Sequence, residues 1–248
     1  MMGARPELGY VRAPEPIHFP EEAEVPESKM HLEVRTFLYK LLQFALGPDH
    51  SVGSDQFVYW NAADNRRSVA PDVIVKLGVP DAYFGSWKTW ERGGAPDMAV
   101  EIVSPSERER GGPEWEEKLS SYHELGVSEL VRFDAEQPEG RRLRVWDRVE
   151  GDLVERVIAG DRTPCLTLGL AWTVRTITAL PADVLGLRLV DDEGRWLETR
   201  EEKTEAARRG EAEARATAET ARRVEAEARA TAEARVRELE EELRRRGG

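Results

Sequence analysis

The most constraining feature of the sequence is an abrupt change in composition near residue 198. From Glu198 to Arg246 there are almost no aromatic or branched apolar residues, and Ala, Glu and Arg dominate. The octapeptide AEARATAE occurs at 212–219 and again at 226–233, a shift of two heptads. Such a segment cannot build a hydrophobic core, so the core of a globular domain has to come from the residues before it.

The segment 198–248 is predicted to be one long helix, because Ala, Glu and Arg are strong helix formers. The evidence for a coiled coil is weaker than the evidence for a helix, because the only apolar residues at heptad spacing are Val236, Leu239 and Leu243. Two interpretations stay open. The segment is a solvated charged helix, or it is a weak coiled coil through which the chain forms a homodimer or docks a partner.

The rest of the chain is long enough for one domain with a substantial core. A single cysteine, Cys165, excludes an intramolecular disulfide framework and a cysteine-based zinc cluster, and it suits a reducing cytoplasm. The first residues show no apolar leader, and no run of about 18 apolar residues occurs anywhere. We therefore expect a cytoplasmic protein without a membrane span.

The net charge of −12 lies almost wholly before residue 198, because 198–248 holds 14 Glu against 13 Lys and Arg. An acidic chain argues against a broad nucleic-acid surface, which is normally basic. It leaves room for a local basic groove or for a carboxylate site that needs a metal. One group of arginines near a predicted strand either meets phosphates or balances neighbouring acids: Arg141, Arg142, Arg144 and Arg148.

The segment 1–27 carries five prolines and several glutamates, which predicts an extended or disordered lead-in. The domain is expected over 28–197. Its first helix follows Ser28, a candidate N-cap, and stops at Gly47-Pro48. Apolar residues at helical spacing support it: Met30, Val34, Phe37, Leu38, Leu41, Leu42 and Ala45.

Strands and one further helix follow in the predicted order. The pattern favours strands at 51–60, 71–77 and 97–103, with a loop over 80–94. It then favours a helix over 113–125, capped by Gly126, and strands at 129–134, 142–148 and 153–158. This order indicates an α/β or α+β domain with one central sheet.

Two Pro-Asp pairs precede apolar runs, at Asp72 and at Asp97, but only the second run ends on a carboxylate, Glu101. On one strand Asp97 and Glu101 would lie about 13 Å apart, whereas ligand oxygens bind a divalent ion at about 2.0–2.6 Å. Asp97 is therefore read as a strand-start residue, and Asp72, from a neighbouring strand, is the candidate partner of Glu101. The alternative is a Glu101 that faces solvent or pairs with an arginine, because an unpaired buried carboxylate costs several kcal/mol.

Over about 28–160 the chain carries an ordered set of motifs: Pro71-Asp72, Glu101-Ile102-Val103-Ser104-Pro105-Ser106, Lys118, Tyr122, Gly126-Val127 and Asp134. This ordered set resembles the Uma2 family of the PD-(D/E)xK nuclease superfamily. His31 stands where that family usually has a histidine at the start of its first helix. The resemblance implies a restriction-endonuclease-like fold, with a central mixed sheet flanked by helices. The strand 129–134 fits the family's aromatic-rich pattern loosely.

The resemblance also implies metal-assisted phosphodiester hydrolysis on DNA. Asp72 and Glu101 would hold one or two Mg²⁺ or Mn²⁺ ions, with the Val103 carbonyl as a further ligand. The superfamily's lysine, two residues after the glutamate, is replaced here by Val103, and Lys118 on the following helix substitutes for it. Lys118 would orient the attacking water or neutralise charge on the phosphate; the alternative is a solvated surface lysine.

Three further residues are accessory candidates. Tyr122 lies one helical turn after Lys118, where it contacts substrate or simply packs. His31 either touches the site or is structural, and Glu33 is a candidate accessory acid. The leading hypothesis is a Mg²⁺-dependent DNA endonuclease. The alternative is a catalytically inactive, nuclease-like binding module that assembles through its C-terminal helix.

Overall fold

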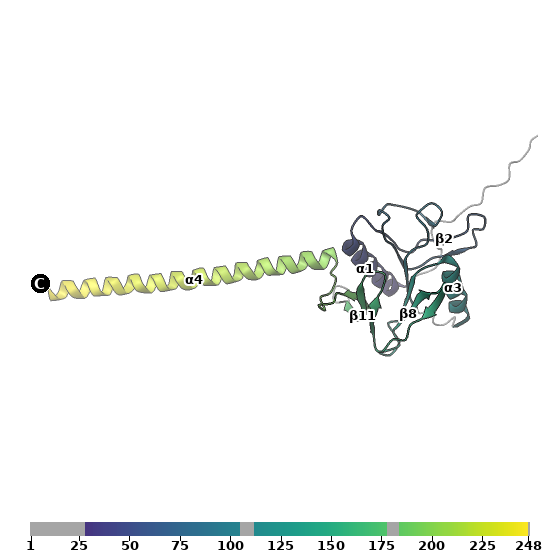
Figure 1. The fold of residues 1–248 in the computed structure, drawn as a ribbon. Coiled ribbons are helices and arrows are strands. Elements are labelled where there is room, and N and C mark those ends of the chain that lie inside the picture. The colour runs from purple at the N-terminus through teal and green to yellow at the C-terminus, as the bar shows by residue number, and fades with distance from the viewer. Residues whose placement is uncertain (1–27, 105–111, 178–183, 248) are drawn as a thin grey trace, which may run out of the picture. The chain divides into compact units, whose positions relative to one another are not determined.

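The computed structural model describes residues 28–104, 112–177 and 184–247 (Figure 1). The segment 1–27, expected to be extended, lies outside the described residues. The chain divides into two compact units between Leu197 and Glu198.

A six-stranded mixed sheet forms the centre of the first unit. Its strand order is β1-β4-β6-β7-β8-β9; β6 and β7 run parallel, and the other neighbours are antiparallel. The strands are β1 (Ser51–Gly53), β4 (Val73–Lys76), β6 (Met98–Ile102), β7 (Glu129–Phe133), β8 (Leu143–Val149) and β9 (Asp152–Glu155). The expected central mixed sheet is confirmed.

Two hydrophobic cores lie on the two faces of this sheet. On one face, Val100, Val131 and Val145 pack with helix α1 (Lys29–Leu46) and with a sheet of β10 (Arg162–Cys165), β11 (Leu170–Ile177) and β12 (Val184–Val190). On the other face, Ala99 and Leu130 pack with helix α3 (Gly112–Leu125). A small sheet of β2 (Val58–Tyr59), β3 (Ser68–Val69) and β5 (Trp87–Lys88) completes that second core.

The bounds of helices α1 and α3 agree with those predicted from the sequence. The Ser28 side chain accepts a hydrogen bond from the His31 amide at 3.2 Å, which caps the start of α1. Gly47 follows α1 with a φ of 68°, and Gly126 follows α3 with a φ of 91°. These left-handed conformations favour glycine, because a side chain there is strained.

The prediction of one strand over 51–60 is wrong. The segment holds β1 and β2, which belong to different sheets. Asp55, between them, has a left-handed φ of 57° and donates its amide to the Pro71 carbonyl. This turn ends the ladder with β4 and sends the chain to the other face of the sheet.

Among the described residues, two three-stranded sheets that the sequence did not predict accompany the central one. β5 lies inside the segment expected to be a loop, 80–94. The sheet of β10, β11 and β12 comes after the last predicted strand. Its middle strand pairs with the whole length of β12, from Ala171↔Val190 to Ile177↔Val184.

The second unit is helix α4 (Arg200–Arg246), which confirms the predicted long helix. Thr199 caps it, and the Thr199 and Glu202 side chains form a reciprocal capping box. Its charged side chains pair along the surface, as in Arg229–Glu233 at 2.9 Å. None of the described helices is apolar and long enough to cross a membrane.

Candidate active site

The two predicted acids lie beside each other at one end of the β4–β6 ladder. Val73 pairs with Val100, so Asp72 and Glu101, each one residue further along, are neighbours on adjacent strands. Both residues are buried, with relative exposures of 7% and 3%. The strand spacing excludes Asp97 as the partner of Glu101. The pairing of β4 with β6 places Asp72 next to Glu101 instead.

Helix α3 supplies two partners to the Glu101 carboxylate. Lys118 Nζ donates to Oε2 at 2.6 Å, and the Tyr122 hydroxyl donates to Oε1 in a short hydrogen bond. Lys118 and Tyr122 are four residues apart, so they share one face of the helix. The Tyr122 side chain is fully buried, whereas the Lys118 side chain is 27% exposed. Lys118 is thus neither a freely solvated lysine nor a fully buried one.

Backbone and helix α1 hold the Asp72 carboxylate. Its Oδ2 accepts a hydrogen bond from the Ile102 amide at 2.6 Å, and its Oδ1 lies 3.2 Å from His31 Nε2. His31 Nε2 also lies 2.7 Å from the Ile102 carbonyl oxygen. Asp72 therefore contacts the backbone amide of Ile102, the residue that follows Glu101, and His31 contacts its backbone carbonyl.

Arg35 is a second side chain of α1 beside Asp72, and the sequence analysis did not predict it. It lies four residues after His31 on the same face of α1, with Nε 3.9 Å from Asp72 Oδ1. Its Nη1 contacts Ser54 Oγ at 3.3 Å and Asp55 at 3.1 Å, and Ser54 donates to the Asp72 carbonyl. Arg35 could have been identified from the sequence, because it is an arginine at a position where the helical periodicity predicts an apolar residue.

Two other predicted residues make different contacts. Glu33 is two residues from His31 on α1, so the two side chains leave the helix in different directions, and the Glu33 carboxylate contacts Lys29 of the same helix at 3.7 Å. The Val103 amide donates to the Phe133 carbonyl, and the Val103 side chain lines a small cavity with His31 and Ile102. The backbone carbonyl in contact with His31 is that of Ile102.

Asp97 has a structural role, as the strand argument expects. Its carboxylate accepts from Lys76 Nζ at 2.9 Å and from the Leu77 amide at 2.7 Å. Its backbone carbonyl accepts the amides of Ser128 and Glu129. Asp97 thus joins the end of β4 to the beginnings of β6 and β7, at the opposite end of β6 from Glu101.

Within the described residues, no three His, Cys, Asp or Glu side chains gather in a way that could hold a metal ion. The site instead consists of two buried carboxylates from adjacent strands, a lysine and a tyrosine from one helix, and a histidine and an arginine from the other. It lies in an α+β domain built on a central mixed sheet.

A comparison with known families identifies the particular group. The Uma2 family, described as "Putative restriction endonuclease", matches residues 20–178. The chain belongs to this family. No curated protein matches it. Among solved structures it is similar to one described as "a putative nuclease belonging to DUF820" from Anabaena variabilis, at 12% identity and a TM-score of 0.37, over 53% of this chain and 69% of that one.

Proposed function

We propose that this Uma2 protein is a divalent-metal-dependent endonuclease that hydrolyses DNA phosphodiester bonds, with Asp72, Glu101 and Lys118 at its centre. The observation that carries the proposal is the Glu101 carboxylate, buried beside a second buried carboxylate and bonded to a lysine. Buried ion pairs contribute little net stability, and apolar side chains of similar volume often stabilise a protein as well or better. A chemical role accounts for polar residues in this position more readily than packing does.

The donors fit a hard divalent cation. Two carboxylates from adjacent strands are neighbours, and the backbone carbonyls of Ile102 and Val103 follow Glu101 in the chain. Mg²⁺ is typically bound through one or two carboxylates and completes its shell with water and phosphate oxygens, so a third acidic side chain is not required. Asp72 and Glu101 would hold the ion, with the carbonyl of Val103 or of Ile102 as a further ligand; Mn²⁺ suits the same donors.

A bound ion would polarise the phosphate and lower the pKa of a water molecule. The protein's own residues prepare the site for it. His31 and Arg35 place two cationic or hydrogen-bonding groups against Asp72 and fix its orientation. Tyr122 donates to one oxygen of Glu101 and fixes that carboxylate in the same way.

Lys118 is the residue proposed to contact the substrate. Its ammonium group sits on a flexible four-carbon chain and is partly exposed, so it can turn from Glu101 to a phosphate oxygen without moving helix α3. There it would neutralise charge that develops on the phosphate or orient the attacking water. Glu33 contacts Lys29 and projects from α1 in a different direction from His31, so it is left out of the proposed site.

The test is cleavage of supercoiled and linear DNA by the purified full chain with Mg²⁺, with Mn²⁺ and with a chelator. Asp72→Asn and Glu101→Gln preserve side-chain shape, and each is expected to lower cleavage at least about 100-fold. Asp64→Asn, an acid paired with Arg66 on the surface, is the matched control and is expected to cleave normally. Cleavage that persists in both site variants, with circular dichroism showing a native fold, contradicts the proposal.

The second candidate is an inactive, nuclease-like binding module that assembles through α4. Every described residue of α4 is solvent-exposed or nearly so, and none is buried. Its apolar residues at heptad spacing, Val236, Leu239 and Leu243, are 53%, 44% and 70% exposed. A second copy of the chain would cover this seam in a parallel or antiparallel pair.

Two measurements separate the candidates. Calorimetric titration of Mg²⁺ and Mn²⁺ tests the metal site, and light scattering tests the mass of the full chain against that of Leu239→Glu. Absence of metal binding together with a dimer that Leu239→Glu dissociates favours the binding module. Metal binding that requires Glu101, in a chain of monomer mass, favours the nuclease.

A further inference from the structure

A row of charged side chains crosses the central sheet from the proposed active site. Glu101 on β6 pairs with Arg132 on β7, and Arg132 pairs with Arg144 on β8. Residues that are directly paired on neighbouring strands project from the same face. Neighbouring strands lie about 4.8 Å apart, so Arg144 is about 10 Å from Glu101 at the level of the backbone.

Arg132 and Arg144 are directly opposite each other, an arrangement that costs stability when both carry the same charge. Aromatic rings hold both side chains in place. The Arg132 guanidinium stacks at 4.5 Å over Trp115 of α3, and that of Arg144 stacks at 4.7 Å over Trp146. Stacking orients a guanidinium without cancelling its charge.

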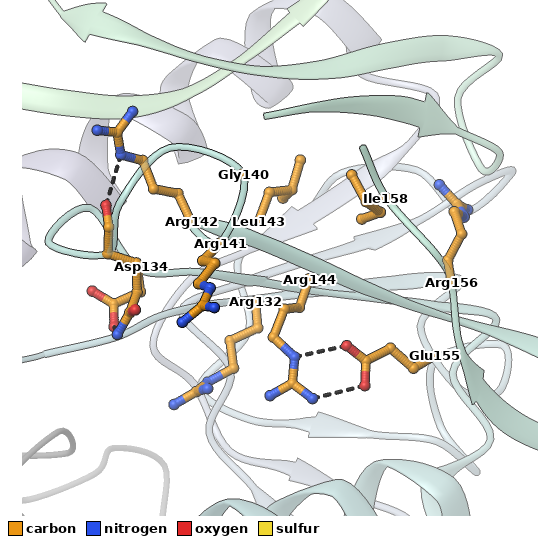
Figure 2. Close-up of a pocket in the computed structure, with 11 residues that line it drawn as sticks. Arg132, Asp134, Gly140, Arg141, Arg142, Leu143, Arg144, Glu155, Arg156 and Ile158 are labelled. Carbon is orange, nitrogen blue, oxygen red and sulfur yellow. Dashed lines mark hydrogen bonds and ion pairs between the residues drawn. The ribbon is translucent and has the colours of Figure 1, made fainter. Parts of the chain in front are cut away.

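Arg144 also forms a bidentate ion pair with Glu155, in which each of the two hydrogen bonds is 2.7 Å long (Figure 2). This bond raises the pKa of Arg144 above its usual value and lowers that of Glu155. Both groups therefore remain charged at neutral pH.

The two arginines border a pocket of about 360 Å³ at the beginning of β8 (Figure 2). Its lining is strongly basic in a chain whose net charge is −12. Five arginines face two acids in it: Arg132, Arg141, Arg142, Arg144 and Arg156 against Asp134 and Glu155. Arg142 pairs with Asp161, Arg144 with Glu155 and Arg156 with Asp147, so acids balance these three arginines within the described residues.

Arg141 is the distinctive member of this group. It is exposed, in the turn before β8, and its guanidinium makes no ion pair or hydrogen bond within the part of the chain that the structure describes. Its backbone amide is held by the Pro138 carbonyl at 3.0 Å, so the turn that presents it is ordered. The side chain points toward the space between Asp134 and Arg144 (Figure 2).

We propose that this arginine pocket binds the phosphate backbone of the nucleic-acid strand that enters the active site. Arg141 contacts a phosphate oxygen. It lies three residues before Arg144, which places it about 14 Å from Glu101 at the level of the backbone. A guanidinium group matches phosphate geometry, and a phosphate held at this distance from the acid pair sets where along the strand the metal site falls. The location beside Glu101 rests on the proposed function, but the binding of phosphates by the pocket does not.

The experiment measures binding of a fluorescent DNA oligonucleotide to the full chain by anisotropy, with a chelator present so that no cleavage occurs. The variants are Arg141→Gln and Arg141→Glu, and Arg66→Gln is the matched control. Arg66 is an exposed arginine paired with Asp64, so its loss changes the net charge equally. Each measurement is repeated over a range of salt concentrations.

Arg141→Gln is expected to weaken binding about five- to tenfold, regardless of DNA sequence, and Arg141→Glu more than that. The slope of log affinity against log salt is expected to fall by about 0.7–0.9 for each lost phosphate contact. Arg66→Gln is expected to stay within about twofold of the parent protein. Equal affinities and equal salt slopes for Arg141→Gln and Arg66→Gln overturn the inference.

The outcomes separate this inference from the proposed function. DNA binding that depends on Arg141, in a protein that cleaves with neither metal, refutes the nuclease and keeps the arginine pocket. If cleavage depends on Asp72 and Glu101 while DNA binding does not change in the Arg141 variants, that result supports the nuclease and refutes phosphate binding by the arginine pocket. The absence of measurable DNA binding by the full chain also refutes phosphate binding by the arginine pocket.

Discussion

Lys118 Nζ lies 2.6 Å from Glu101 Oε2, although the two residues are 17 positions apart in the chain. The lysine reaches the carboxylate from helix α3, which packs against the face of the sheet on which Glu101 projects. The position two residues after Glu101 is Val103, whose side chain is buried. A helix thus supplies to this site the positive charge that the strand itself lacks.

The first prediction concerns this pair. Lys118→Met leaves the buried Glu101 carboxylate without its ammonium partner, so the metal-free protein is expected to lose roughly 1–3 kcal/mol of unfolding free energy. Because no lysine then competes for the carboxylate, Mn²⁺ is expected to raise the melting temperature more in this variant than in the parent protein. Thermal unfolding with and without Mn²⁺ measures both effects.

The control for that experiment is Lys29→Met, since Lys29 is highly exposed and contacts Glu33 only at 3.7 Å. It is expected to leave stability and the metal response almost unchanged. DNA cleavage should be lost in Lys118→Met and retained in Lys29→Met. A Lys118→Met protein with parental stability, metal response and cleavage contradicts the role assigned to Lys118.

The second prediction concerns Tyr122. Its side chain is fully buried and its hydroxyl donates to Glu101, so it both packs and positions. Tyr122→Phe keeps the ring but leaves one carboxylate oxygen without a donor, and a cost of about 1–2 kcal/mol is expected in chemical denaturation. Tyr83→Phe, at a fully exposed tyrosine, should cost nothing measurable. Equal stability of the two variants would show that the hydroxyl does not matter.

The active-site geometry could be predicted from the sequence only where local rules determine it. The spacing of Asp97 and Glu101 along one strand excludes a shared ion, and the helical spacing of Lys118 and Tyr122 places both on one face. The position of Arg132 beside Glu101 could not be predicted. It depends on the pairing of β6 with β7 and on its register, which long-range packing decides.

The fold shows the same division. Continuous apolar runs identified β4, β6 and β7, because burial on both faces leaves a strong pattern. Strands of two residues, such as β2 and β5, carry no periodicity at all. In the sheet of β10, β11 and β12 the pattern is interrupted by Pro164 and Gly186. Gly186 is required there because a side chain would collide with Ile177.

The third prediction contrasts the two Pro-Asp pairs. Asp97→Ala removes the partner of Lys76 and of the Leu77 amide, and the unfolding free energy is expected to fall by roughly 1–3 kcal/mol. Metal binding should persist, because Asp97 lies at the far end of β6. Asp72→Ala should abolish metal binding. Urea denaturation and calorimetric titration of both variants test this; a loss of metal affinity in a folded Asp97→Ala protein contradicts it.

The fourth prediction concerns Cys165, which is buried against Met98 and Glu129. Burial, and secondarily the negative charge of Glu129, raises the pKa of this thiol far above its usual value. The thiol is therefore expected to resist thiol-directed reagents in the native protein at pH 8 and to react readily in denaturant. Fast labelling of the native protein contradicts this.

The raised pKa of Cys165 also gives stability a pH dependence with a defined sign. In the unfolded chain a cysteine ionises near pH 8.5, whereas the buried thiol keeps its proton, so the folded state binds more protons in alkali. Stability is fully present below about pH 8.5 and falls as the pH rises, by about 1.4 kcal/mol between pH 7.5 and 9.5. Cys165→Ala removes this contribution, so the difference in unfolding free energy between the parent and Cys165→Ala proteins should shrink or change sign over that interval. Parallel pH profiles for the two proteins would show that the thiol ionises equally easily in both states.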